Sequence, residues 1–235
     1  MRLHSTTWGS GDRTALLVHG LMADHRTWRR VGPALASRGY RVIAVDLRGH
    51  GASARAAGPE AYRPEDYADD LVENLPAGAE LAVGNSLGGL ALLRAVERLA
   101  PARAVYSDPA WHLRRGPDGY VPELFVRGKS LSRDLVKGFN PRWSDEDLDT
   151  EMESVRVWDE RSAYGLVDVT GTDMWPLRPA VPSLVTLADP SLLISADDAR
   201  MLEGRGFALR TVAGAGHTIH RDDFDGFMSA LDDWF

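Results

Sequence analysis

Gly84-Asn85-Ser86-Leu87-Gly88 is the stretch that decides the fold of this 235-residue chain. It has the form Gly-x-Ser-x-Gly, with an apolar run before it (81–83) and a helix-like apolar run after it (90–96). This pattern predicts a buried strand, a sharp turn at Ser86 and then a helix. The glycines permit a strained turn that a Cβ would obstruct, and the turn lifts the serine hydroxyl into a cleft. The free N–H groups that begin the helix would face negative charge on a bound molecule.

Short apolar segments alternate with helix-like segments over most of the chain. The expected strands are Thr14–Val18, Arg41–Val45, Glu80–Val83, Ala102–Tyr106, Ser183–Leu187 and Ala208–Val212. The expected helices include Trp28–Ser37, Pro64–Leu75 and a last one over about Asp222–Trp234. Apolar strands separated by helices predict an α/β fold with a mostly parallel sheet that helices cover on both faces.

The alternation stops between Trp111 and Trp175, in a segment that includes the helix start Ser144-Asp145-Glu146-Asp147. The segment leaves the sheet at the carboxyl edge, where ligands bind in open α/β sheets. We therefore expect a core domain in two parts (1–110 and 177–235) with a small helical cap or lid (111–176) between them. Tryptophans of the cap either bind substrate or pack the cap's own core. The candidates for substrate binding are Trp111, Trp143 and Trp158.

A serine hydroxyl becomes an effective nucleophile only when a base takes its proton. The best candidate base for Ser86 is His217, which follows the last strand in the glycine-rich loop Gly214-Ala215-Gly216-His217. We expect His220 to be structural. A zinc site formed by His217-x-x-His220 would lack a third ligand, and the sequence predicts no metal.

The imidazole needs a carboxylate that fixes its tautomer and stabilises the imidazolium. Asp108 and Asp189 both follow predicted strands at the correct edge, and each precedes a proline. Asp189 is one helix and one strand away from His217, so we expect it to be the acid, with Asp108 as the alternative.

A tetrahedral intermediate also needs an oxyanion hole, usually two backbone N–H groups. The N–H of Leu87, just past the nucleophile, is the first candidate. The second candidate is the N–H of Leu21, in the loop after the Thr14–Val18 strand. We expect His19 to brace that loop.

Four motifs in this order resemble those of the α/β-hydrolase fold family: His19-Gly20-Leu21, Asp46-Leu47-Arg48-Gly49-His50-Gly51-Ala52-Ser53, Gly84-Asn85-Ser86-Leu87-Gly88-Gly89 and Gly214-Ala215-Gly216-His217. The resemblance covers nearly the whole chain outside the cap and implies the chain order Ser, acid, His. The sequence departs from the family pattern in its acid loop. There the family commonly has an Asp about two residues beyond Asp189, where this chain has Ser191. This departure keeps Asp108 open as the acid.

The resemblance implies a serine hydrolase without a cofactor that works through an acyl-enzyme. The cap is rich in aromatic residues and has more acidic than basic residues, so we expect the substrate to be an uncharged, fairly apolar small-molecule carboxylic ester or lactone. The alternative is a ligand-binding or non-hydrolytic member of the same fold. A net charge of −7 without a basic stripe argues against nucleic acid and anionic membranes as partners. The chain has no cysteine and no apolar leader, so we expect a cytoplasmic protein. Nothing in the sequence indicates an oligomeric state.

Overall fold

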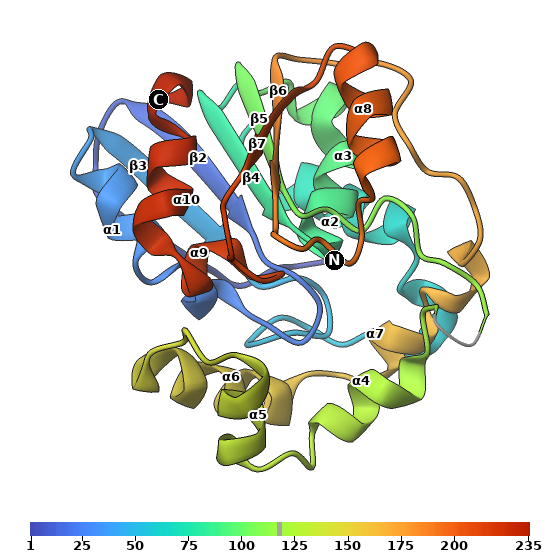
Figure 1. The fold of residues 1–235 in the computed structure, drawn as a ribbon. Coiled ribbons are helices and arrows are strands. Elements are labelled where there is room, and N and C mark those ends of the chain that lie inside the picture. The colour runs from blue at the N-terminus through green and yellow to red at the C-terminus, as the bar shows by residue number, and fades with distance from the viewer. Residues whose placement is uncertain (117–118) are drawn as a thin grey trace.

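The computed structural model describes residues 1–116 and 119–235. Its centre is a seven-stranded sheet with the order β1-β3-β2-β4-β5-β6-β7 (Figure 1). β1 is antiparallel to β3, and the other neighbouring strands are parallel. The strands are β1 (Ser5–Trp8), β2 (Arg13–Val18), β3 (Tyr40–Val45), β4 (Leu81–Asn85), β5 (Arg103–Ser107), β6 (Ser183–Leu187) and β7 (Ala208–Thr211).

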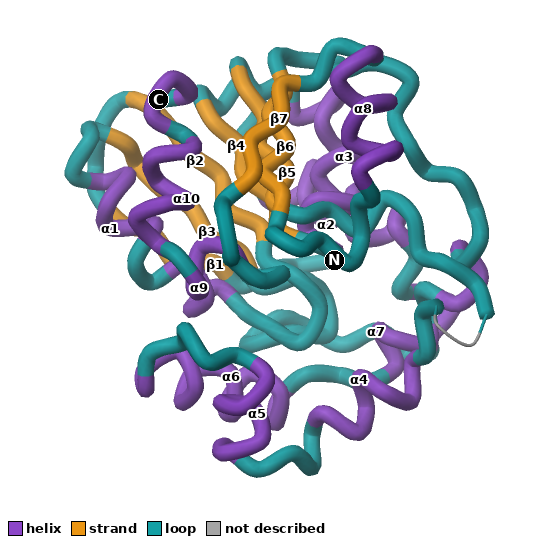
Figure 2. Tube along the Cα trace, in the orientation of Figure 1, coloured by secondary structure: helices purple, strands orange, loops and turns teal. Residues whose placement is uncertain are grey.

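Helices cover both faces of the sheet, as the continuous apolar strands predict. Leu16 of β2 belongs to one apolar core, which includes residues of α2, α3 and α8. The next residue, Leu17, belongs to the opposite core, with residues of α1 and α10. Figure 2 shows the resulting three layers, with the sheet between two layers of helices. The helices of the core are α1 (Val31–Ala36), α2 (Pro64–Asn74), α3 (Leu87–Leu99), α8 (Ala196–Gly204), α9 (Ile219–Asp222) and α10 (Phe224–Ala230).

Two of the expected helices differ from those in the structure. Trp28 lies in a 3₁₀ turn, η1 (His25–Trp28), that precedes α1. The last expected helix is divided into α9, α10 and a final turn, η4 (Asp232–Trp234). The division falls at Asp223, whose side chain accepts a hydrogen bond from the N–H of Gly226 and so begins a new helix. The edge strand β1 was not predicted, because it is short and only half buried.

Four short helices lie between β5 and β6, below the carboxyl ends of the strands in Figure 1. They are α4 (Pro122–Gly128), α5 (Arg133–Phe139), α6 (Asp145–Val157) and α7 (Arg161–Tyr164), and we call them the cap. α6 begins at the capping box that the sequence predicts, with the Ser144 side chain accepting from the N–H of Asp147. Among the described residues, no helix has both the length and the apolar character to cross a membrane.

Candidate active site

Ser86 lies at the sharp turn between β4 and α3. Its backbone angles, φ 53° and ψ −117°, are ones that a residue with a side chain rarely adopts. Three hydrogen bonds hold this turn. The N–H of Ser86 donates to the carbonyl of Ser107 at 3.0 Å, and its carbonyl accepts from Leu90 and Ala110, both at 3.1 Å. Neighbouring backbone on both sides therefore stabilises the strained conformation.

The glycines on either side of Ser86 allow the helix to begin directly against the sheet. A Cβ on Gly84 would lie 2.5 Å from the carbonyl oxygen of Gly88. A Cβ on Gly88 would lie 2.3 Å from the carbonyl oxygen of Val18, in the neighbouring strand β2. These contacts are with backbone, which cannot move aside, so each position requires glycine.

His217 lies in the loop between β7 and α9, and its Nδ1 is 2.6 Å from Oδ2 of Asp108. Asp108 is the residue directly after β5, and it is fully buried. The imidazole can therefore donate its Nδ1 proton to this carboxylate and leave Nε2 free as a base. The structure brings His217 together with the alternative acid, Asp108, and not with the preferred one.

The expectation that Asp189 is the acid is therefore wrong. The carboxylate of Asp189 accepts a hydrogen bond from the N–H of Gly214 at 3.1 Å, and its own N–H donates to the carbonyl of Ala215 at 2.8 Å. Asp189 thus braces the backbone of the loop that carries His217. Asp108 is fully buried and reaches the imidazole, whereas Asp189 is exposed and its carboxylate is taken up by the backbone of the loop.

The two expected oxyanion donors lie beside Ser86. Leu21 and Leu87 line the same cavity as Ser86 and His217. A Cβ on Gly20 would be 3.1 Å from Cβ of Ser86, which places the loop of Leu21 directly against the serine. Within the part of the chain that the structure describes, the N–H groups of Leu21 and Leu87 donate to no protein acceptor. Both are therefore available for a substrate oxygen.

His19 braces the loop that carries Leu21, as the sequence predicts. Its Nδ1 donates to the carbonyl of Gly20 at 2.7 Å, and its Nε2 accepts from the N–H of Leu47 at 2.9 Å. Complete burial lowers the pKa of His19, so the ring is neutral, as a ring with one donating and one accepting nitrogen must be.

A cavity of about 370 Å³ opens beside Ser86 and His217. α4 of the cap forms one wall with Leu124 and Phe125, and the segment after β6 contributes Leu192 and Leu193. The rest of the lining consists of Leu21, Leu87, Ala110, Leu113, Arg114, Gly119, Tyr120, Val121 and Leu166. The lining is mostly aliphatic and aromatic, apart from the exposed Arg114.

The three tryptophans expected to bind substrate do not line this cavity. Trp111 is fully buried. Its ring lies edge-on to that of Tyr106, with the ring centroids 4.8 Å apart, and its Nε1 donates to the carbonyl of Gly89. Trp143 is also buried, in a small core within the cap. Trp158 is fully buried, and its Nε1 donates to Oγ of Ser162 at 2.6 Å. All three are packing residues, so the prediction that they bind substrate is wrong.

The sequence gives no sign that residues of α4 line the cavity. Leu124 is 59% exposed, although it lies beside the catalytic candidates. A large apolar residue that is exposed on a short cap helix is a signal for a binding surface. That signal is visible only when the burial of each residue is known. In the sequence, Leu124 and Phe125 look like ordinary core residues.

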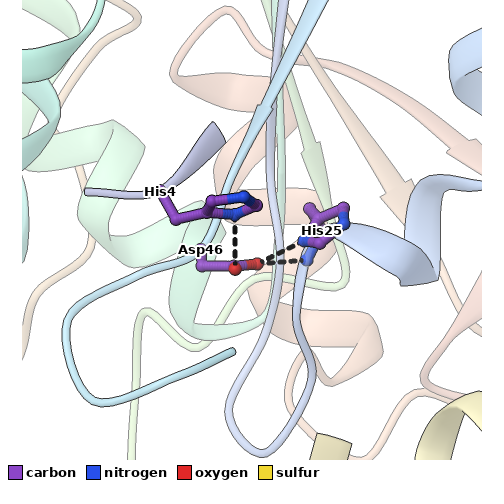
Figure 3. Close-up of side chains that lie close together, drawn as sticks. All are labelled: His4, His25 and Asp46. Atoms are coloured by element: carbon purple, nitrogen blue, oxygen red, sulfur yellow. Dashed lines mark hydrogen bonds and ion pairs between the residues drawn. The ribbon is translucent and has the colours of Figure 1, made fainter. Parts of the chain in front are cut away.

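His4, His25 and Asp46 form the one cluster in the described residues that has the composition of a metal site (Figure 3). Nδ1 of His4 is 2.9 Å from Oδ2 of Asp46, and Nδ1 of His25 is 2.8 Å from Oδ1. The N–H of Ala52 donates to Oδ2 and the N–H of His25 to Oδ1. Each carboxylate oxygen therefore already accepts two hydrogen bonds. The cluster joins the chain before β1 to the start of η1 and to the loop after β3, and we interpret it as structural.

His220 is also structural, as expected. It is buried, stacks on Trp28 with ring centroids 4.2 Å apart, and its Nε2 is 2.8 Å from Oγ1 of Thr27. Burial lowers its pKa well below the ordinary value for histidine, and it is held neutral. His217, in contrast, lines the same cavity as Ser86.

The chain belongs to the alpha/beta hydrolase family, whose model matches residues 15–230. The sheet, the flanking helices and the motifs agree with the fold that the sequence predicts.

Similar proteins extend over nearly the whole chain. The chain is 29% identical to the magnesium-chelatase 30 kDa subunit of Rhodobacter capsulatus, over 93% of this chain and 85% of the relative. It is 27% identical to N-formylmaleamate deformylase of Pseudomonas putida, over 100% of this chain and 92% of the relative. The crystal structure of an N-formylmaleamic acid deformylase from Pseudomonas putida superimposes with a TM-score of 0.82 at 23% identity, covering 98% of this chain and 95% of that one.

Proposed function

We propose that this protein is a serine hydrolase that cleaves an uncharged, fairly apolar carboxylic ester or lactone through an acyl-enzyme. The observation that carries the proposal is the 2.6 Å contact between Nδ1 of His217 and the carboxylate of Asp108. It fixes the imidazole in the tautomer that can accept a proton at Nε2, next to a cavity that Ser86 also lines.

In the acylation step, Oγ of Ser86 attacks the carbonyl carbon of the substrate while Nε2 of His217 takes the hydroxyl proton. The Asp108 carboxylate stabilises the imidazolium that forms. The N–H groups of Leu21 and Leu87 stabilise the negative charge on the former carbonyl oxygen. When the intermediate collapses, His217 gives its proton to the departing alkoxide oxygen.

In the second half of the reaction, water attacks the acyl-enzyme. His217 removes a proton from this water, and the second tetrahedral intermediate again places its oxyanion against Leu21 and Leu87. Collapse of this intermediate returns the proton from His217 to Oγ of Ser86 and releases the carboxylic acid. For a lactone, the acid and alcohol remain in one molecule, so hydrolysis opens the ring without a separate leaving group.

The lining of the cavity supports the substrate class. Aliphatic and aromatic side chains of α4 and of residues 192–193 face the space beside the serine. Apolar groups of a substrate would gain burial there, whereas a polyanionic group would lose its hydration with few partners.

The similarity to a magnesium-chelatase subunit favours a second candidate, a ligand-binding or non-hydrolytic role of the same pocket. Both candidates predict binding of an apolar molecule, but only the hydrolase requires a reactive serine.

The test is covalent labelling combined with a substrate panel. An organophosphonate should react with wild-type protein at Ser86, and p-nitrophenyl esters of increasing chain length, with a set of lactones, should be hydrolysed. Ser86→Ala should lose labelling and lower kcat by about 10⁴-fold or more, the scale seen when a triad nucleophile is removed. An adduct on another residue, or full activity in Ser86→Ala, would exclude the mechanism.

A further inference from the structure

Ser191 lies in the segment between β6 and α8, and its hydroxyl contacts the acid of the proposed triad. Its Oγ donates to Oδ1 of Asp108 at 2.6 Å. The same Oγ accepts hydrogen bonds from the N–H of Leu193 at 3.2 Å and of Ile194 at 3.0 Å. A serine hydroxyl has one hydrogen and two lone pairs. With two backbone donors on its lone pairs, the hydrogen is left to point at the carboxylate.

Asp108 is held from several directions. Its φ of 41° is in the left-handed region, and its N–H donates to the carbonyl of Thr186 at 2.8 Å. This backbone position fixes where the side chain starts but not how the carboxylate is rotated. Ser191 binds one carboxylate oxygen, and the other faces Nδ1 of His217. The rotation that satisfies the first contact also provides the second.

We propose that Ser191 is a positioning residue that fixes the orientation of the Asp108 carboxylate and, through it, the imidazole of His217. The proposal rests on the proposed function of Ser86, His217 and Asp108. Ser191 touches neither the substrate nor the reacting atoms in this role. It acts because its own hydroxyl is oriented by the backbone of the turn that it begins.

The first test is Ser191→Ala, with activity measured on the best ester of the panel. Loss of a charge-assisted hydrogen bond to a buried carboxylate should lower kcat by roughly 10- to 100-fold, whereas KM should stay within about twofold. Ser191→Thr keeps the hydroxyl and should recover most of kcat. A KM increase with unchanged kcat would contradict the proposal, because it would show a contact with bound substrate.

Ser195→Ala is the matched control, because Ser195 lies in the same segment and its Oγ also both donates to a carboxylate and accepts from a backbone N–H. It accepts from the N–H of Asp198 and donates to the Asp198 carboxylate, which caps α8 away from the catalytic groups. This variant should lower the thermal midpoint and leave kcat unchanged. If Ser195→Ala lowered kcat as much as Ser191→Ala does, the effect would be a general loosening of the segment, and the proposal would fail.

A double-mutant cycle with Asp108→Asn separates positioning from local structure. Because Ser191 acts through the carboxylate, Ser191→Ala should change the residual rate of the Asp108→Asn protein by less than about twofold. An equal loss in both backgrounds would overturn the proposal. If Ser191→Ala does not fold, Ser191→Cys takes its place in the cycle, since a thiol is a weak donor and the chain has no other cysteine.

Failure of this inference is distinguishable from failure of the proposed function. Wild-type activity in Ser191→Ala together with an inactive Ser86→Ala would exclude the positioning role alone. Activity that survives Ser86→Ala would exclude the hydrolase mechanism on which the role depends.

Discussion

Asp108 and Asp189 both follow strands of the parallel sheet, yet their carboxylates contact different partners. Asp108 is fully buried and pairs with the imidazole of His217, whereas Asp189 accepts a hydrogen bond from the backbone of Gly214. The two residues look alike in the sequence, since each precedes a proline. At the residue scale, we assign the triad acid by which carboxylate reaches Nδ1 of His217, and that carboxylate belongs to Asp108.

Replacing each aspartate by asparagine tests this assignment. Asp108→Asn should preserve the fold and lower kcat by roughly 10⁴-fold, because the amide favours the wrong imidazole tautomer. Asp189→Asn should leave kcat within a few fold, because the amide oxygen can still accept from Gly214. The measurement is kcat on one ester together with a thermal midpoint for each variant. The opposite ranking of the two variants would return the acid to Asp189.

The turn at Ser86 makes a second prediction at the residue scale. Gly84→Ala would place a Cβ 2.5 Å from the carbonyl oxygen of Gly88, so the variant should lose at least about 1–3 kcal/mol of unfolding free energy. Gly138 is the matched control, because it lies in α5 and a Cβ there meets no described atom within 4 Å. Gly138→Ala should stabilise the protein slightly, by about 0.5–1 kcal/mol. Urea unfolding of both variants measures the difference, and equal effects would show that the turn tolerates a side chain.

At the scale of elements, α6 is attached to the core mainly through arginines. Arg29 pairs with the buried Asp147 at 2.9 Å, and the buried Arg221 pairs with Glu151 at 2.6 Å and lies over the ring of Trp143. α4 has no comparable charge contacts with the core in the described residues, and its Leu124 is exposed at the cavity. The cap therefore combines one firmly held helix with one that presents apolar side chains to the site.

This division predicts which cap residues select substrates. Phe125→Ala enlarges the cavity, so its kcat/KM should change unequally along a series of acyl chains, by about 1–3 kcal/mol per methylene. Trp143→Ala should instead lower the unfolding free energy by about 3–5 kcal/mol and leave the ratios between substrates unchanged. Parallel measurement of stability and of the chain-length profile separates the two roles. A flat profile for Phe125→Ala would remove α4 from the substrate site.

The central strands, the turn at Ser86 and the place of His217 in the loop after the last strand could be predicted from the sequence, because these depend on local patterns. A strand buried on both faces is apolar throughout, and a strained serine turn needs glycine at fixed positions. The acid and the cavity wall depend instead on which segments become neighbours. Asp108 is buried beside His217 whereas Asp189 is exposed, and Trp143 packs inside the cap whereas Phe125 lines the cavity. Apart from Ser191 in the acid loop, local patterns carry no information on either choice.

At the scale of the whole molecule, buried histidines make the unfolding free energy depend on pH. His19, His50 and His220 are fully buried, and burial lowers the pKa of each, for His50 to about 3. In the unfolded chain they take up protons below about pH 6.5. The unfolded state then binds more protons than the folded state, so stability should fall as the pH decreases below that value.

His25 has the opposite effect on the pH dependence of stability. Burial acts to lower its pKa, but the hydrogen bond to Asp46 and the negative charges of Asp46 and Asp24 together outweigh burial and raise the pKa. Its contribution to stability is therefore fully present below about pH 6.5 and is lost as the pH rises through its folded-state pKa. Because three buried histidines have a lowered pKa and only His25 has a raised one, we expect a net loss of stability on acidification.

Urea unfolding between about pH 5 and pH 7.5 measures this balance, with a slope of about 1.4 kcal/mol per pH unit for each proton taken up on unfolding. His220→Gln keeps a partner for Thr27 but cannot be protonated, so it should reduce the slope by up to one proton. Its lost stacking on Trp28 lowers stability equally at every pH and leaves the slope unaffected. His25→Gln should steepen the slope instead, because it removes the opposing group. If both variants gave the wild-type slope, the pH dependence would originate in groups other than these imidazoles.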